Sequence, residues 1–214
     1  MAVLHCTTMS PGKRELLTEW LPSRPWYRGG VRPRLAKAGG FRLDDPAGEV
    51  GIEFVVVTDD SGARPTTYHV PMTYRGAELT EAADALIGTS EHGVLGLRWI
   101  YDGPRDPVAL AQIVALLSGN AQPQAQSASD TPDDSIRVAN PLTALAAGQF
   151  ATVDGSEDTE ISMIGGPVLR VHRRLEPEVA LGPGITTVTA PWGSSGDSAS
   201  RSVLLSARSK FLHG

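Results

Sequence analysis

Hydrophobic and polar residues alternate most regularly between residues 49 and 75. The alternating apolar positions are Val50, Ile52, Phe54 and Val56, followed by Tyr68, Val70, Met72 and Tyr74. Between the two runs, residues 59–62 read Asp-Asp-Ser-Gly, which is turn chemistry. We therefore expect one long β-hairpin with a single apolar face. Other elements must cover that face, because a lone hairpin is barely stable in water.

Helical spacing of apolar residues precedes the hairpin. Leu16, Leu17, Trp20 and Leu21 fall on one side of residues 11–21, after a Ser10-Pro11 start that suits a helix N-terminus. We expect this helix to lie across the apolar face of the hairpin. A second helix is predicted from Asp106-Pro107 to Gly119; it is apolar nearly all round and should be buried.

Further strands are predicted around the hairpin. Residues 35–43 indicate a strand with a Gly-Gly bulge, and residues 94–101 indicate another strand. Pro71 lies inside the second arm of the hairpin, where it predicts an edge strand or a bulge.

Residues 120–134 lack large apolar side chains and have the composition of a flexible linker. Beyond them, residues 136–145 predict a strand followed by a turn or short helix. Further strands are predicted at 159–164, 168–175, 185–190 and 203–207, with a hairpin turn at Gly165-Gly166. The flexible stretches are a loop at 193–200 and a frayed end at 209–214. The expected organisation is a first domain at 1–119, a linker at 120–134 and a small, mostly antiparallel sheet at 135–214.

Composition narrows the classes of function. Hydrophobic residues make up 41% of the 214 residues, which suffices for a core, and the net charge of −5 argues against a general nucleic-acid binder. The single cysteine, Cys6, predicts a reducing compartment. We find no signal peptide and no apolar run long enough to span a bilayer, so we expect a cytoplasmic protein without membrane or nucleic-acid partners.

The usual catalytic motifs are missing from the sequence. It contains no phosphate-binding P-loop, no dinucleotide fingerprint and no histidine pair at metal-ligand spacing. The paired acids at 44–45, 59–60 and 133–134 fall in turns and are interpreted as solvated turn-formers. We therefore predict no catalytic residue and no metal site.

A cationic stripe is the most unusual stretch. If residues 167–178 form a strand, then Arg170, His172 and Arg174 share one face, while Arg173 lies on the other face with Leu169. Three such side chains could hold a phosphate group, because arginine offers a bidentate fork. The alternative is an ordinary solvated face balanced by nearby glutamates.

Two aromatic residues, Trp26 and Tyr27, follow the first helix in a turn. Trp26 is interpreted first as a core residue, since buried aromatics dominate small cores. The alternative is that Trp26 and Tyr27 form an exposed interaction surface.

Several segments together resemble the N-terminal half of the actinobacterial maltokinase family. They are ELLTEWLPSRPWYRGG, YHVPMTYRG, LIGTSEHGVLGLRWIYDGPRDP and DTEISMIGGPVLRVHRRLEPE, in the family's order. The resemblance implies an α+β fold: a cystatin-like curved antiparallel sheet on an N-terminal helix, then a small sheet resembling a kinase small lobe.

Two departures from the family bear on activity. Arg170 stands where the family has its phosphate-contacting lysine, and the given chain ends where a kinase lobe with its catalytic base and metal ligands would follow. We therefore expect that the chain is not a maltokinase by itself. No cofactor is expected, except that the cationic stripe could bind Mg-ATP.

Three functions follow from this interpretation. The first is a non-catalytic, stand-alone cap-like protein that binds or regulates an enzyme of α-glucan, trehalose or maltose 1-phosphate metabolism, or that self-associates. The second is a degenerate nucleotide or sugar-phosphate binder using Arg170, His172 and Arg174. The third is a glucan-active enzyme of the branching type, which the positions of the acids in turns do not favour.

Overall fold

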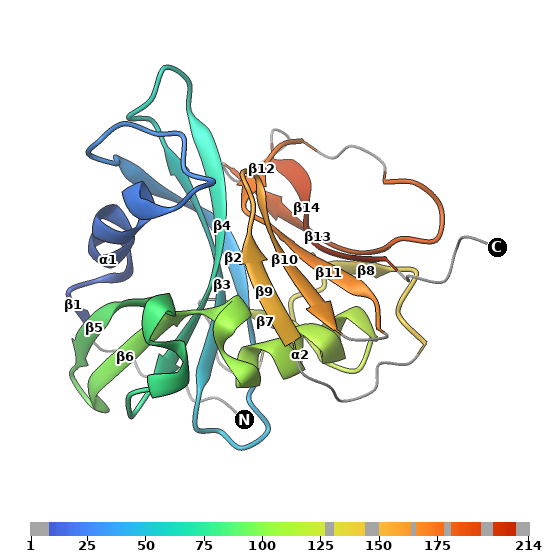
Figure 1. Ribbon diagram of the computed structural model, residues 1–214, viewed down its shortest axis with the longest axis horizontal. Helices are drawn as coiled ribbons and strands as arrows, with labels where there is room; N and C mark the ends of the chain where they lie inside the picture. The colour runs from blue at the N-terminus through green and yellow to red at the C-terminus, as the bar shows by residue number, and fades with distance from the viewer. Residues whose placement is uncertain are drawn as a thin grey trace.

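The computed structural model describes residues 9–126, 131–143, 150–163, 166–177, 181–193 and 199–208. Within these ranges, two antiparallel sheets pack face to face (Figure 1). Helix α1 lies on the outer side of the first sheet, and helix α2 packs into the core that the sheets share. No helix in these ranges is long and apolar enough to cross a membrane.

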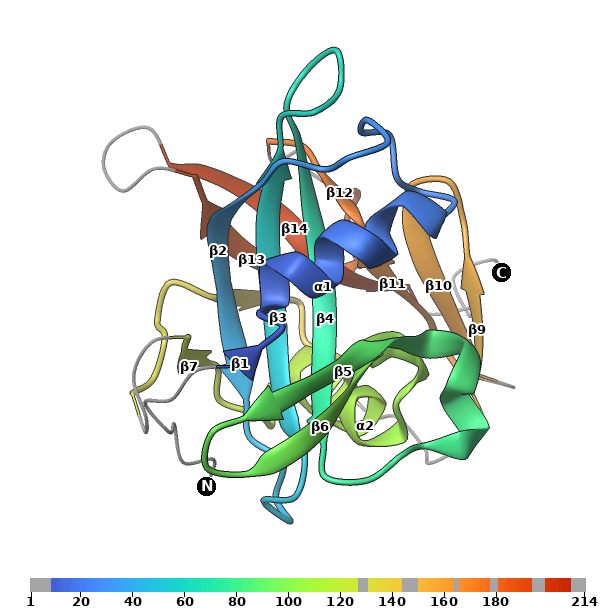
Figure 2. The same cartoon turned by 90° about the vertical axis from the view of Figure 1, so that its left-hand side faces the viewer.

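The first sheet has eight strands among the described residues, in the order β1-β5-β6-β4-β3-β2-β7, with β12 paired to β4. These strands are β1 (Met9–Ser10), β2 (Leu35–Leu43), β3 (Gly51–Asp59), β4 (Thr66–Arg75), β5 (Leu86–His92), β6 (Gly96–Asp102), β7 (Gln124–Ala125) and β12 (Arg174–Leu175). The sheet curls, so that the β5–β6 hairpin crosses in front of β3 and β4 below α1 (Figure 2). The predicted strands at 35–43 and 94–101 are confirmed, the first with its bulge between Lys37 and Gly39.

The predicted central hairpin is confirmed as β3 and β4, but it does not have a single apolar face. Phe54 lies opposite Pro71, and Val55 lies opposite Val70. Residues directly opposite each other share a face of a sheet. Phe54 and Val70 therefore point to opposite sides. The six-residue connection at 60–65 sets this register, and both faces of the hairpin are buried.

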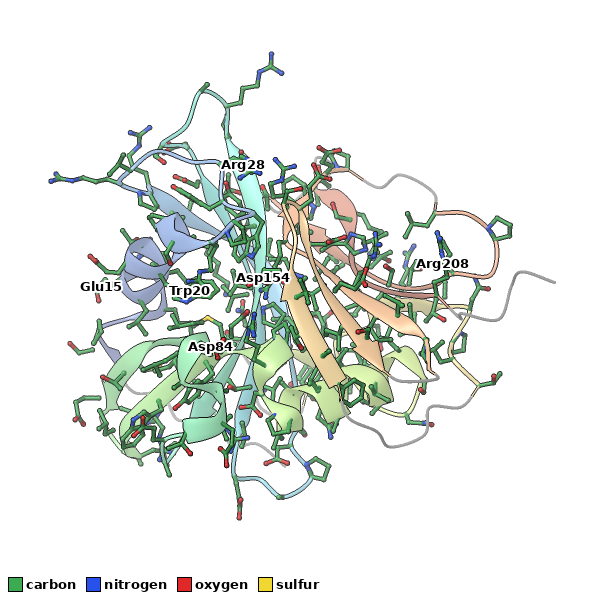
Figure 3. The ribbon with its side chains drawn as sticks, viewed as in Figure 1. Glu15, Trp20, Arg28, Asp84, Asp154 and Arg208 are labelled. Carbon is green, nitrogen blue, oxygen red and sulfur yellow. The ribbon has the colours of Figure 1, made fainter. Side chains whose placement is uncertain are left out.

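The first predicted helix is confirmed as α1 (Lys13–Trp20), continued by η1 (Leu21–Ser23). It begins later than expected: Gly12 is the N-cap, and its N–H donates to a Glu15 carboxylate oxygen at 2.6 Å. Leu16, Leu17 and Trp20 are buried against the hairpin face that carries Val70. Figure 3 shows Trp20 between α1 and the sheet and Glu15 on the outer side of the helix.

The prediction that Pro71 marks an edge strand or a bulge is wrong. β4 is paired along both edges: β3 runs along one, while β12 and β6 share the other. The β12 pairing reaches Tyr68 and the β6 pairing starts at Met72. Pro71 lies in the gap between them, where no neighbour needs the N–H that proline lacks.

Strand β5 was not predicted, because Gly88, Thr89 and Ser90 interrupt its apolar pattern. It follows the short helix η2 (Thr80–Ala85). After η3 (Gly103–Arg105), the second helix is confirmed as α2 (Pro107–Leu117). Asp106 caps it by accepting a bond from the Val108 N–H at 2.9 Å.

The second sheet runs in the order β8-β13-β14-β11-β10-β9. Its strands are β8 (Arg137–Ala139), β9 (Phe150–Asp154), β10 (Asp158–Met163), β11 (Val168–His172), β13 (Thr186–Trp192) and β14 (Ser200–Arg208). The mostly antiparallel second sheet is confirmed, although β9 was not predicted. Cys6, Gly165, most of the loop at 193–200 and the end at 209–214 lie outside the described residues.

The core continues across the predicted domain boundary. One cluster of buried apolar residues joins Phe54 of the first sheet, Ile113 of α2 and Leu205 of the second sheet. β7 falls inside the predicted linker at 120–134 and pairs with β2, while β12 falls inside the predicted second domain and pairs with β4. The domain division at 119 and 135 stays a prediction, whereas the core and the pairing cross it.

Candidate functional site

A groove of about 1300 Å³ runs along α1 on the concave face of the first sheet. One wall is α1, the other is β2, and residues 48–53, Tyr74 and the tip of the β5–β6 hairpin complete it. We call it the α1 groove. It exists because α1 covers the β4 side of this face and leaves the β2 side open (Figure 2).

A buried carboxylate organises the α1 groove. Glu53 of β3 is 4% exposed, and three side chains donate to it. The Lys13 ammonium lies 2.6 Å from its oxygens, the Gln126 amide donates at 2.6 Å and the Tyr74 hydroxyl at 2.8 Å. The donors come from α1, the end of β7 and β4, so this one carboxylate ties together the elements that border the groove.

The charge of Glu53 also acts on Tyr74. Burial raises the pKa of the Tyr74 phenol well above its usual value, and the neighbouring carboxylate raises it further. Tyr74 therefore stays protonated and donates to Glu53 throughout the physiological pH range.

Gly40 keeps the β2 wall open. Its φ of +137° is a conformation that other residues rarely adopt, and a Cβ there would lie 2.3 Å from the Phe54 carbonyl oxygen and 2.9 Å from Gln126 Nε2. A glycine at this position thus leaves room for Gln126 to reach Glu53.

The rim of the α1 groove is charged, and an apolar tip adjoins it. Arg14 and Lys37 form no ion pair with the described part of the chain. At the tip of the β5–β6 hairpin, Val94 is 62% exposed, Leu95 46% and Leu97 38%. They are three of the six large apolar residues that are clearly exposed among the described residues. Leu95 also lines the groove, so tip and groove form one surface.

The structure divides the cationic stripe between the two sheets: Arg170 and His172 lie on β11 of the second sheet, and Arg174 lies on β12 of the first. Each of the three side chains already has a partner. Arg170 faces Asp158 at 3.4 Å and Glu160 at 3.2 Å, and Arg174 pairs with Glu157. Burial lowers the pKa of His172, so this imidazole is neutral at pH 7. The phosphate site stays a prediction, and this geometry does not favour it.

Trp26 and Tyr27 do not form a shared exposed surface. Trp26 is fully buried, as the core interpretation predicts, and packs against Trp20 and Tyr68 at centroid distances of 5.8 and 5.9 Å. Because Trp26 is buried against the sheet, a partner cannot contact it. Tyr27 is half-buried, and its hydroxyl donates to Asp59 at 2.7 Å.

The interpretation of the paired acids as solvated is wrong for Asp45 and Asp59. Both are buried, at 5% and 1% exposure, because their carboxylates accept several backbone N–H bonds of the turns that they form. Burial alone would raise the pKa of Asp59, but the bonds from Tyr27, Ser61 and Arg34 outweigh it and lower the pKa. These acids are turn-formers, as predicted, that are held inside the fold.

Arg173 is the functional candidate that sequence reasoning passed over. It is fully buried between the sheets, where Nη2 donates to Asp102 at 2.5 Å and Nε donates to the Thr159 hydroxyl at 2.7 Å. Side chains alternate between the two faces of a strand, so the pattern that predicts an outer stripe also predicts that Arg173 lies on the apolar face with Leu169. This position was the sequence signal for a buried arginine. An arginine on an apolar strand face needs a buried partner.

Comparison with known families identifies the part of the chain that holds this surface. The family model for the maltokinase N-terminal cap domain matches residues 20–106. The resemblance to a maltokinase cap-like family is therefore confirmed over these residues. They include β2 to β6 and thus the sheet side of the α1 groove, while α1 before Trp20 and the second sheet lie outside the match.

Proposed function

We propose that this protein is a non-catalytic binding module of the maltokinase-cap type. Its partner is an enzyme of α-glucan, trehalose or maltose 1-phosphate metabolism, and the α1 groove with its apolar tip is the docking surface. The family match at residues 20–106 supports the choice of a partner from these pathways. The geometry of the groove and its apolar tip supports the choice of docking surface.

The observation that carries the proposal is an apolar surface with a charged rim. Val94, Leu95 and Leu97 stand exposed beside a large groove, whereas scattered apolar residues on a surface need no explanation. Along the adjoining groove, Arg14, Lys37 and Glu49 supply charges of both signs. A desolvated apolar centre within a polar rim is the usual anatomy of a protein–protein interface.

The proposed partner segment is defined by this surface. It inserts apolar side chains beside Leu95 and pairs charged groups with the rim. We further propose the finer fold relations that the resemblance implies, a cystatin-like first sheet and a second sheet of the kinase small-lobe type. The curled antiparallel first sheet packed on α1 supports the first of these relations.

The test is complex formation between purified proteins. The full chain is mixed with each purified enzyme of these pathways from the same organism, and mass is measured by size-exclusion chromatography with light scattering. The proposal expects one stoichiometric complex. The protein alone is measured in parallel, because a self-associated particle that binds no enzyme contradicts an enzyme partner.

A matched pair of variants locates the surface. Leu95→Asp places a charge at the tip, and Val153→Asp places one at a more exposed apolar residue of β9, which is 64% exposed. The complex should be lost with Leu95→Asp and kept with Val153→Asp. A complex that tolerates both changes uses another surface.

A further inference from the structure

Arg173 lies where the chain passes from the second sheet to the first. β11 belongs to the second sheet, β12 pairs with β4 of the first, and Arg173 is the one residue between them. Its carbonyl oxygen accepts a bond from the His69 N–H of β4 at 2.9 Å. The backbone at this position is therefore fixed to the first sheet.

The side chain of Arg173 joins the same two sheets through polar contacts. Asp102 ends β6 of the first sheet, and Thr159 lies on β10 of the second. A buried guanidinium stays charged, so it needs such partners to compensate the cost of its burial. Arg173 therefore fixes the position of the second sheet relative to β6.

A third contact leads from Arg173 to the α1 groove. The guanidinium carbon lies 5.0 Å from the ring centroid of Trp26, in cation–π geometry. Trp26 in turn meets the Trp20 ring edge-on at 5.8 Å. Trp20 is the last residue of α1, and Lys13 at the other end of that helix holds Glu53. The contacts of Arg173, Trp26 and Trp20 thus connect the second sheet to α1, the helical wall of the groove.

This junction is incompletely hydrogen-bonded. Arg173 Nη1, Asp102 Oδ1 and Trp26 Nε1 are buried without a hydrogen-bond partner in the described structure. Buried groups of this kind are uncommon in native proteins. A rearrangement of this junction would therefore break no hydrogen bond at these three atoms.

We propose that Arg173 is a positioning residue for the α1 groove: through Trp26 and Trp20 it sets the position of α1 according to the position of the second sheet. The inference rests on the proposed function, since it concerns the regulation of that docking surface. It makes the second sheet, which lies outside the family match, the part that controls the groove.

The test is amide hydrogen exchange of the full chain without any partner. Arg173→Lys keeps a charge for Asp102 but loses the planar group that stacks on Trp26. We expect exchange in α1 (Lys13–Trp20) to rise about tenfold, from a lost desolvated cation–π contact. Exchange in β13 and β14 should stay unchanged. Arg170→Lys, on the outer face of the same sheet, is the control and should change neither.

A second variant separates positioning from stability. In the double variant Arg173→Met with Asp102→Leu, apolar side chains replace the buried ion pair, a change that often preserves stability. The global unfolding midpoint should be kept while α1 exchanges faster. Unchanged exchange in α1 in both variants would overturn the proposal. An equal rise in every element would also overturn it, because it would mean general loosening.

The same variants distinguish this inference from the proposed function. If α1 loosens in Arg173→Lys but affinity for the partner enzyme is unchanged, then Arg173 positions α1 and the groove is not the docking surface. If α1 does not loosen while Leu95→Asp still abolishes the complex, the docking surface stands and the role of Arg173 is wrong.

Discussion

The two faces of the central hairpin are covered in different ways. On one face, Phe54 is fully buried and stacks on Phe41 with ring centroids 4.3 Å apart, under α2 and the second sheet. On the other face, α1 covers β4 and leaves a groove of about 1300 Å³ against β2. Both faces bury core residues, and the face under α1 also has a groove that is available for binding.

The difference follows from the sizes of the covering elements. α1 crosses the strands obliquely (Figure 2) and has 8 residues, so it is about 12 Å long. It therefore covers only part of the face that β2, β3 and β4 form. The second sheet has no such limit, and with α2 it seals the opposite face.

The largest effect is expected on the sealed face. Phe54→Ala should lower the free energy of unfolding by about 3–5 kcal/mol, because it removes a large side chain from a packed core. Leu95→Ala at the open face should change it by less than about 0.5 kcal/mol. Urea unfolding measures both variants. A loss below about 1 kcal/mol for Phe54→Ala would show that this face is not tightly packed.

The next effect concerns the buried carboxylate of the open face. Glu53→Gln leaves the donors around it incompletely satisfied and should cost about 1–3 kcal/mol of unfolding free energy. It also removes a negative charge that raises the pKa of Tyr74, so this pKa should fall. Alkaline titration of phenolate absorbance measures the change. Glu49→Gln, on the exposed rim, is the control and should leave the titration unchanged.

A smaller effect is the pH dependence of stability that the buried His69 causes. Burial lowers the pKa of His69 to about 3, helped by the charge of Arg173, whereas an unfolded histidine has a pKa of about 6.5. Between these values, the unfolded state binds a proton that the native state does not. Stability should therefore fall with decreasing pH below about 6.5, by at most about 1.4 kcal/mol per pH unit from this group.

Unfolding in urea at pH 7, 6 and 5 measures this slope. His69→Phe removes the titrating group and should flatten the slope, although the buried His172 contributes in the same direction. If the slope were the same in His69→Phe and the original protein, His69 would not be held neutral at the sheet junction.

The smallest effect is expected at the cationic stripe. The side chain of Arg170 is 51% exposed, so Arg170→Ala should cost less than about 1 kcal/mol. The account also expects no change of melting temperature with Mg-ATP in either protein. A clear stabilisation by Mg-ATP that Arg170→Ala abolishes would instead favour the nucleotide-binding alternative.

Local patterns predicted the elements better than their arrangement. The hairpin, both long helices and the bulge in β2 follow from apolar periodicity and glycine positions. The opposite orientations of Phe54 and Val70 did not follow, because they depend on the register that the connection at 60–65 sets. β5 and β9 were missed because their apolar patterns are weak.

The candidate site was the least predictable part. Glu53 stands in an apolar run and has no sequence neighbour that explains it; its partners Lys13 and Gln126 are 40 and 73 residues away. The stripe of Arg170, His172 and Arg174 drew attention because its members are close together in sequence. Its acidic neighbours on β10 became visible only with the sheet register.

The central claim is that the partner enzyme binds at the α1 groove and its apolar tip. The most direct test is a calorimetric measurement of the dissociation constant of the partner complex for the original protein, Leu95→Asp and Val153→Asp. The account predicts at least about tenfold weaker binding for Leu95→Asp, as for the loss of a central interface residue, and no change for Val153→Asp. Equal affinities for all three proteins would contradict the claim that the half-covered face is where this protein binds its partner.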